Sequence, residues 1–158
     1  MSFRRMLLGF AAAVAACSAT PLTSVPGDSA APGYHIGMVL ELRQERLLQS
    51  PQGLFNPAPA DLVRHGTATT GGVVSIEEYR NSPQTHREII GIVPAGTRLV
   101  VTSINRRTYP GLEPWYEVTA QFLSGSFADR SVSVDRLSAN GTDGRTPLVD
   151  VAEFAVVP

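Results

Sequence analysis

From residue 34 onward, apolar and polar residues alternate in short runs, which is the period of strands that bury one face. The runs predict strands at residues 37–43, 89–93, 99–104, 115–123, 132–137 and 147–157, and Leu47–Leu48 either extends the first strand or begins another after a bend. Clusters of Pro, Gly, Asn and Ser separate these runs, as expected for turns. The pattern predicts a mainly β fold, a small barrel or sandwich of about 5–7 short antiparallel strands.

Two segments do not fit a strand pattern. Ser75 is followed three residues later by Glu78, which is the spacing of a capping box, so residues 75–82 are predicted to form a short helix. A strand that begins at Val73 is the alternative. Residues 51–72, which are rich in Pro, Gly, Ala and Thr, are predicted to form a long loop.

The N-terminal segment has the three zones of a signal peptide. Arg4 and Arg5 supply the positive flank, and residues 6–16 form an uncharged, mostly apolar run that ends in small residues. This run lies within the range of about 7–15 residues for a signal-peptide apolar region, and well below the ~20 residues that cross a bilayer as a helix. Residues 1–16 are therefore predicted to be an export signal.

The sequence Val14-Ala15-Ala16-Cys17 resembles the lipobox of bacterial lipoproteins. The resemblance implies that Cys17 carries a diacylglycerol, that the signal is cut just before it, and that the new N-terminus is acylated. Ser18 stands where an aspartate would favour inner-membrane retention, which implies the outer membrane, with the domain facing the periplasm. The alternative is an ordinary cut at an Ala-x-Ala site. That cut would leave Cys17 as a free thiol, whereas lipidation accounts for this single cysteine.

These features divide the chain into a signal peptide at 1–16, a lipidated flexible tether at 17–33 and a single β-rich domain at 34–158. The tether prediction rests on a small, polar and proline-bearing composition. Removal of the signal takes away Arg4 and Arg5 and no acidic residue, so the formal net charge falls from −1 to −3. A slightly acidic surface argues against nucleic acid as a partner.

Residues 89–138 also resemble bacterial SH3-like domains. These domains combine a Pro-x-Gly-Thr turn, an alternating strand, a Trp-Tyr-x-Val strand and a short closing strand. The corresponding segments here are Pro94-Ala95-Gly96-Thr97, Leu99–Ile104, Trp115-Tyr116-Glu117-Val118 and Val132–Leu137. The sequence departs from that family at Asp129–Val132, where a Gly-Trp-Val motif is expected. The resemblance implies a fold and no particular function.

No catalytic motif accompanies this pattern. The G-x-S-x-G, S-x-x-K, H-E-x-x-H, P-loop and G-x-G-x-x-G signatures are absent, all 13 basic residues are arginine, and a lipid would occupy the single cysteine thiol. His35, His65 and His86 have no metal-ligand spacing, and Glu77 and Glu78 diverge on a helix. We therefore expect no enzyme activity, no cofactor and no metal. The alternative is an envelope hydrolase or enzyme inhibitor whose site, for example a histidine-centred zinc site, assembles only in three dimensions.

The best binding candidates are aromatic and arginine residues around one predicted hairpin. Trp115 and Tyr116 point to opposite faces of a strand, so both pack in the core or one of them is partly exposed. Arg106 and Arg107, beside Tyr109, form either an anion or glycan contact or a solvated charge pair. We expect a binding or assembly module whose partner is an envelope protein or the cell wall, in addition to the membrane lipid.

Overall fold

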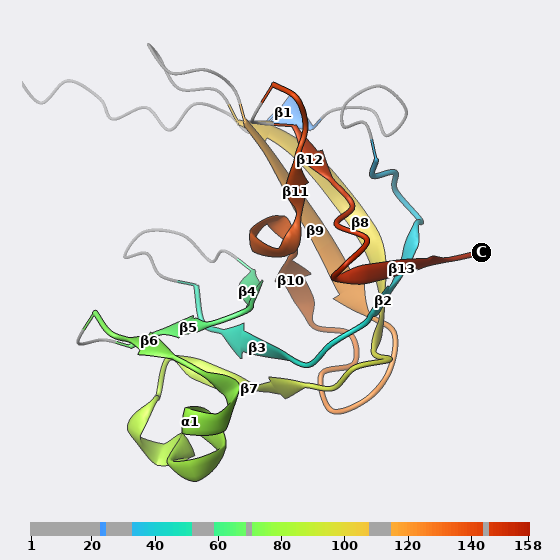
Figure 1. Cartoon of the computed structure of the whole chain (residues 1–158). Helices are drawn as coiled ribbons and strands as arrows, with labels where there is room; N and C mark the ends of the chain where they lie inside the picture. The colour runs from blue at the N-terminus through green and yellow to red at the C-terminus, as the bar shows by residue number, and fades with distance from the viewer. Residues whose placement is uncertain (1–22, 25–32, 52–58, 69–70, 108–114, 144–145) are drawn as a thin grey trace, which may run out of the picture.

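The computed structural model describes residues 23–24, 33–51, 59–68, 71–107, 115–143 and 146–158 (Figure 1). The signal peptide, Cys17 and Tyr109 lie outside the described residues, as do the side chains of Arg107 and Trp115. The described chain is mainly β, which confirms the predicted fold class. Within it, no helix has the length and apolar character needed to cross a membrane.

One large sheet contains most of the strands. Its members are β1 (Thr23–Ser24), β2 (Val39–Leu42), β3 (Arg46–Gln49), β4 (Ala60–Val63), β7 (Ile89–Val93), β8 (Arg98–Arg107), β9 (Trp115–Phe122), β10 (Ser131–Ser133) and β13 (Phe154–Val157). The strand order is β13-β2-β8-β9-β10-β4-β3-β7. β1 is not part of this order and forms an additional pair with β8. β2 and β3, and likewise β7 and β8, are consecutive along the chain but not adjacent in this order, whereas β8, β9 and β10 are neighbours in both.

The remaining elements are short. Two small antiparallel pairs consist of β5 (Gly66–Thr67) with β6 (Val73–Val74) and β11 (Ala139–Asn140) with β12 (Pro147–Leu148). The helices are α1 (Ile76–Asn81) and the 3₁₀ turns η1 (Pro83–Thr85) and η2 (Asp135–Leu137). Figure 1 places α1 beside β5, β6 and β7, at the far end of the molecule from β1.

The chain changes direction where β2 passes into β3 and where β7 passes into β8 (Figure 1). Backbone bonds hold the two bends together: the Leu42 N–H donates to the Thr97 carbonyl at 2.9 Å, and the Gly96 N–H donates to the Leu42 carbonyl at 2.7 Å. The Arg43 N–H, within the first bend, donates to the Glu153 carbonyl at 2.9 Å. The segments β2–β3 and β7–β8 therefore bend together as one antiparallel ladder. The sheet curves around a common interior.

That interior is one hydrophobic core to which nearly every strand of the sheet contributes. Leu40, Leu48, Leu62, Phe122 and Phe154 are fully buried in it and come from β2, β3, β4, β9 and β13. Burying a side chain of this size stabilises the fold by about 1.5–3 kcal/mol. The core therefore joins segments from both ends of the domain.

One strand pair contradicts the prediction of purely antiparallel strands. β10 pairs with β4 in parallel, with Val132 opposite Ala60. β4 and β5 lie within residues 51–72, which were predicted to be a loop, and that prediction is wrong for residues 60–63 and 66–67. The apolar run at Leu62 and Val63 is too short to predict a strand in a stretch rich in Pro and Ala. The strand β4 forms because β3 pairs with one of its edges and β10 with the other.

The sheet is not closed into a barrel. β13 and β7 stand at the two ends of the strand order, and no pairing joins them in the described part of the chain. The barrel prediction is therefore not confirmed, and neither is the SH3-like resemblance. The described strands also outnumber the five to seven predicted, because β1, β4, β5 and β11 have no alternating run to reveal them and a turn divides the last predicted strand into β12 and β13.

The predicted final strand at residues 147–157 is divided in two by a turn. The Asp150 carboxylate accepts a hydrogen bond from the Ala152 N–H at 2.9 Å, and the Asp150 carbonyl accepts one from the Phe154 N–H at 2.9 Å. This side-chain turn takes residues 149–153 out of the β conformation, so that β12 ends at Leu148 and β13 begins at Phe154. Alternating apolar residues alone do not reveal such a turn.

The predicted helix is confirmed at α1. Ser75 is its N-cap, and the Ser75 hydroxyl accepts a hydrogen bond from the Glu78 N–H at 3.1 Å. Glu77 and Glu78 lie in the first turn, where carboxylates favour the helix dipole. Pro83 follows the helix and begins η1. The local capping signal was therefore sufficient to locate this element.

Two residues of the segment 17–33, which was predicted to be a flexible tether, belong to the large sheet. Thr23 and Ser24 form β1 and pair antiparallel with β8, with Thr23 opposite Arg106 and Ser24 opposite Asn105. The pairing depends on a sheet edge that exists only in the folded domain, so the composition of the tether could not predict it. Two residues shortly before the domain are therefore held on its sheet.

Candidate binding site

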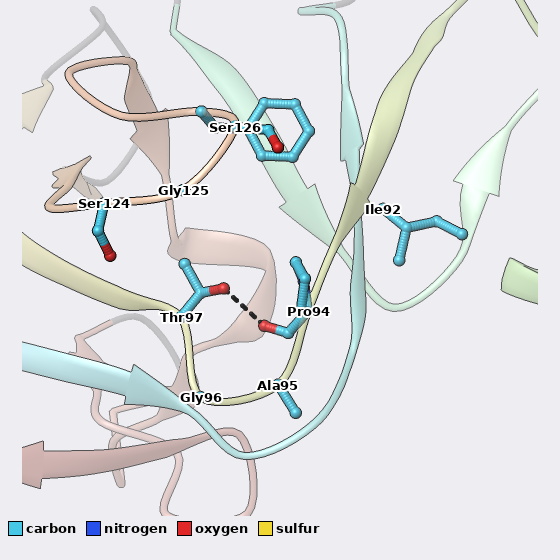
Figure 2. A pocket seen from close by; sticks show the side chains of 9 residues that line it. Ile92, Pro94, Ala95, Gly96, Thr97, Ser124, Gly125 and Ser126 are labelled. Carbon is cyan, nitrogen blue, oxygen red and sulfur yellow. Dashed lines mark hydrogen bonds between the residues drawn. The ribbon is translucent and has the colours of Figure 1, made fainter.

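A pocket of about 330 Å³ lies between two turns that are distant in the sequence. One wall follows the end of β7 and the turn into β8, and the other is the loop between β9 and β10 (Figure 2). The lining residues are Ile92, Pro94, Ala95, Gly96, Thr97, Ser124, Gly125, Ser126 and Phe127. Its volume is at the small end of the range for ligand pockets.

The first wall is the turn that the sequence predicted at Pro94–Thr97. Thr97 closes it, because the Thr97 hydroxyl donates a hydrogen bond to the Pro94 carbonyl at 2.8 Å, as Figure 2 shows. Gly96 has a φ of +79°, in the left-handed region that glycine adopts without strain. The turn is also tied to β2 through the Gly96 N–H. This wall is thus fixed from inside the fold.

The second wall presents Phe127 in a defined position. The rings of Phe127 and the fully buried Phe122 have centroids 5.8 Å apart and an interplanar angle of 40°. Gly91 of β7 leaves room for the Phe127 ring, since a Cβ at Gly91 would come within 2.9 Å of the Phe127 Cζ. Gly91 and Phe122 therefore hold the ring in place, and Phe127 is half-buried beside the pocket.

The chemistry of the pocket is neutral. Among the described residues that line it, none has an ionisable side chain. Ile92, Pro94 and Phe127 offer apolar surface, while the hydroxyls of Ser124 and Ser126 stand on the opposite wall. Leu123, which directly precedes that wall, is 51% exposed. Such a surface can hold an uncharged group by apolar contact and orient it with a few hydrogen bonds.

The aromatic and arginine candidates lie at the other end of β8 and β9. The sheet register places Arg106 opposite Tyr116 and Arg107 opposite Trp115. Arg106 is exposed, and Tyr116 is half-buried and packs against the core. The structure thus brings these four residues together along the backbone, at a distance from the pocket. Tyr109, the fifth candidate, falls outside the described residues.

A second group of polar residues surrounds η2. The Asp135 carboxylate accepts a hydrogen bond from the Val118 N–H at 2.6 Å. Burial raises the pKa of Asp135 to about 7, the Val118 N–H acts against this shift, and the nearby Glu117 and Asp61 add to it. Burial also raises the pKa of Asp61, and the guanidinium of Arg136, with its Nε 3.6 Å from the Asp61 carboxylate, opposes that shift.

The three histidines do not converge. His35 and His65 are exposed, whereas His86 is half-buried between Glu78 and Glu88, with its Nε2 3.7 Å and its Nδ1 3.8 Å from their carboxylate oxygens. Within the part of the chain that the structure describes, the His86 Nδ1 and the Glu88 Oε1 have no hydrogen-bond partner. No group of three or more metal-ligating side chains suited to a metal ion occurs among the described residues.

Sequence reasoning found the pocket only in part. The sequence predicted a turn at residues 94–97 and a break between the predicted strands 115–123 and 132–137, and neither segment was expected to bind. Ile92 was read as a strand residue and Phe127 was not singled out at all. About 30 positions separate the two walls, and only the sheet order brings them together. Gly91, whose missing side chain admits Phe127, was the one local feature that could have pointed to a close contact.

Comparison of the chain with protein-family models, with curated proteins and with solved structures finds no match.

Proposed function

We propose that this chain is an envelope lipoprotein, lipidated at Cys17, held on the outer membrane and facing the periplasm, whose domain at 34–158 is a non-catalytic binding module. The lipobox at residues 14–17 supports the anchor. The observation that carries the binding role is the neutral pocket between residues 92–97 and 124–127. Its walls are fixed by the fold, which reduces the entropy lost on binding.

The ligand is an apolar side chain of a protein partner in the envelope. Phe127, Pro94 and Ile92 provide apolar contact, and Ser and Thr hydroxyls provide the polar contacts of the pocket wall. A polar glycan has many hydroxyl groups, and burying one that lacks a hydrogen-bond partner costs free energy. None of the described residues that line the pocket is an Asp, Asn, Gln or Arg that could meet them. A protein partner therefore fits this surface better than the cell wall.

Site-specific photocrosslinking tests the binding role. A photoreactive amino acid replaces Ser126 in the lipidated protein in its own cells, and a matched control carries it at the exposed Glu77 of α1. We expect one discrete protein adduct at residue 126, which the Phe127→Ala substitution removes, and none at residue 77. Adducts with peptidoglycan fragments would contradict a protein partner and show that the pocket binds the cell wall. Identical adducts at both positions, or none at 126, would contradict binding at the pocket.

Mass spectrometry of the mature protein tests the anchor separately. The proposal expects a chain that begins at an acylated Cys17, and a Cys17→Ser variant that leaves the membrane fraction. A mature chain that begins elsewhere, or an unmodified Cys17, would overturn the lipoprotein assignment. The pocket lies within the domain, so the crosslinking result would stand on its own.

The alternative function is an envelope hydrolase, and one observation favours it. Burial raises the pKa of Asp135 to about 7, and a carboxyl group with a shifted pKa can serve in acid–base catalysis. Asp135 does not line the pocket, and its hydrogen bond to the Val118 N–H gives it a structural role. Hydrolysis of envelope peptides or glycans by the purified domain, lost in a folded Asp135→Asn variant, would favour the enzyme over the binding module.

A further inference from the structure

The pairing of β1 with β8 limits how far the domain can stand from its anchor. β1 lies on the same edge of β8 as β2: Val39 is opposite Val100, and Ser24 and Thr23 are opposite Asn105 and Arg106. β2 therefore covers the beginning of β8 and β1 covers its end. Figure 1 shows β1 at the end of the long β8–β9 pair that lies farthest from α1.

Only a short stretch of chain separates β1 from Cys17. Residues 18–22 connect them, and six residue steps of fully extended chain reach at most about 20 Å. A lipid on Cys17 would hold the thiol at the membrane surface. β1 must then begin within about 20 Å of that surface, whatever path the connecting residues take, and the end of β8 that carries Asn105 and Arg106 lies one strand spacing, about 5 Å, from β1.

The pocket lies at the opposite end of β8. Thr97, in its first wall, immediately precedes Arg98, the first residue of the strand. β8 contains ten residues, and at about 3.3 Å per residue it is about 30 Å long. The pocket lies at one end of β8 and the site of attachment at the other. The length of the strand that separates them is greater than the reach of the connecting chain.

We propose that the end of the molecule formed by β1, Asn105, Arg106 and Tyr116 lies against the surface of the lipid bilayer, and that the pocket faces away from it. The inference rests on the proposed function, since it requires the lipid on Cys17. It extends that function by assigning the domain an orientation and a second contact surface. A partner that reaches the pocket would then approach from the side away from the membrane.

The chemistry of this end is compatible with lipid headgroups. Arg106 is exposed, and a guanidinium group binds phosphate oxygens with two parallel hydrogen bonds. Tyr116, opposite Arg106, is half-buried and combines an apolar ring with a polar hydroxyl, as tyrosines at membrane interfaces do. Glu117 lies opposite Asn105, so the end is not uniformly basic. The chain length limits how far this end can stand from the membrane, and the exposed Arg106 favours contact with headgroups, whereas net charge does not support the orientation.

Depth-dependent quenching tests the orientation. Lipidation blocks the Cys17 thiol, so a new cysteine is the single site for a thiol-reactive fluorophore. Arg106→Cys labels the proposed membrane end, and Ala95→Cys is the matched control at an exposed position of the pocket turn. The lipidated proteins are reconstituted in vesicles of phosphatidylethanolamine and phosphatidylglycerol that carry a nitroxide on the headgroup. We expect a strong loss of fluorescence at residue 106 and almost none at 95.

The outcomes separate the orientation from the anchor. A protein that floats with the vesicles but is quenched equally at both positions, or more strongly at 95, would overturn the orientation while leaving the anchor intact. A protein that does not float would contradict the lipid anchor, and with it the orientation.

A disulfide test examines the β1 pairing without any membrane. In a Cys17→Ser background, Thr23→Cys and Arg106→Cys stand directly opposite one another, within the range of Cα separations that a disulfide spans. The matched control pairs Thr23→Cys with Thr102→Cys, an exposed position four residues earlier on β8. We expect the first pair to oxidise readily and the second pair not to. Equal oxidation of both pairs, or none in the first, would remove the constraint on which the orientation depends.

Discussion

The guanidinium of Arg46 and the carboxylate of Glu153 form a buried ion pair between residues that are 107 positions apart. Both side chains are less than a tenth exposed. Glu153 also accepts a hydrogen bond from the Nε of Arg64 at 2.7 Å, and Arg64 binds Asp150 at 3.1 Å. This network attaches the turn before β13 to β3 and to the turn after β4, at the place where the large sheet bends.

The first prediction concerns the loss of this buried pair. Glu153→Ala leaves the Arg46 guanidinium buried without its partner, so we expect it to lower the free energy of unfolding by about 3–5 kcal/mol. Arg64 is 46% exposed, and we expect Arg64→Ala to cost less than about 1 kcal/mol. Urea unfolding of the three proteins measures both values. Similar losses for the two variants would show that the burial of Arg46 does not govern the effect.

The second prediction concerns the contact that positions Phe127. A methyl group at Gly91 would clash with the ring, so we expect Gly91→Ala to lower the free energy of unfolding by about 1–3 kcal/mol. Phe127→Ala removes the clash, so Gly91→Ala should cost much less in that background. A double-mutant cycle measured by urea unfolding gives the coupling energy. Additive losses would mean that the ring does not rest on Gly91.

The third prediction is a pH dependence of stability that originates at Asp135. Its pKa is raised from 3.8 to about 7 in the folded protein, so between these values the folded state binds more protons than the unfolded state. Stability from this group is therefore lost as the pH rises from about 4 to 7. The raised pKa of Asp61 acts in the same direction.

Asp135→Asn provides the test, because its amide oxygen can still accept the Val118 N–H. Urea unfolding gives the free energy of unfolding of both proteins at each pH. We expect the value for Asp135→Asn, relative to that of the unsubstituted protein, to increase between about pH 4 and pH 8. Glu77→Gln, at an exposed position of α1, serves as the control and should show no such trend. A difference between Asp135→Asn and the unsubstituted protein that is constant with pH would mean that Asp135 does not titrate in this range.

The fourth prediction concerns the left-handed residue of the pocket turn. Space around Gly96 is open, but its φ of +79° strains any other residue. We expect Gly96→Ala to cost about 1–2 kcal/mol and Gly96→Asn less, since asparagine tolerates this conformation better. Thermal or urea unfolding measures the order. Ala95→Ser, next to it and exposed, should change stability by no more than about 0.5 kcal/mol. Equal losses for all three would point to a general sensitivity of the turn.

Much of the local structure followed from local patterns. The alternation in residues 115–123 located β9, and Ser75 with Glu78 located α1, because a strand face or a helix cap involves only residues close in the sequence. The β4 strand escaped prediction, since its pairing with β3 and β10 comes from neighbours elsewhere in the sheet. The pocket escaped it for the same reason, because Phe127 becomes part of a site only where Gly91 meets it.

The sequence by itself determined the β-rich class, the helix cap and the position of the Pro94–Thr97 turn, and it carries the lipobox prediction at Cys17. The tertiary structure alone decided the parallel pairing of β4 with β10, the buried pair of Arg46 with Glu153, and the attachment of Thr23 to the end of β8. The division has a physical cause. Propensity, capping and turn chemistry act over a few residues, whereas sheet order and buried charge depend on which distant segments the collapsed core brings into contact.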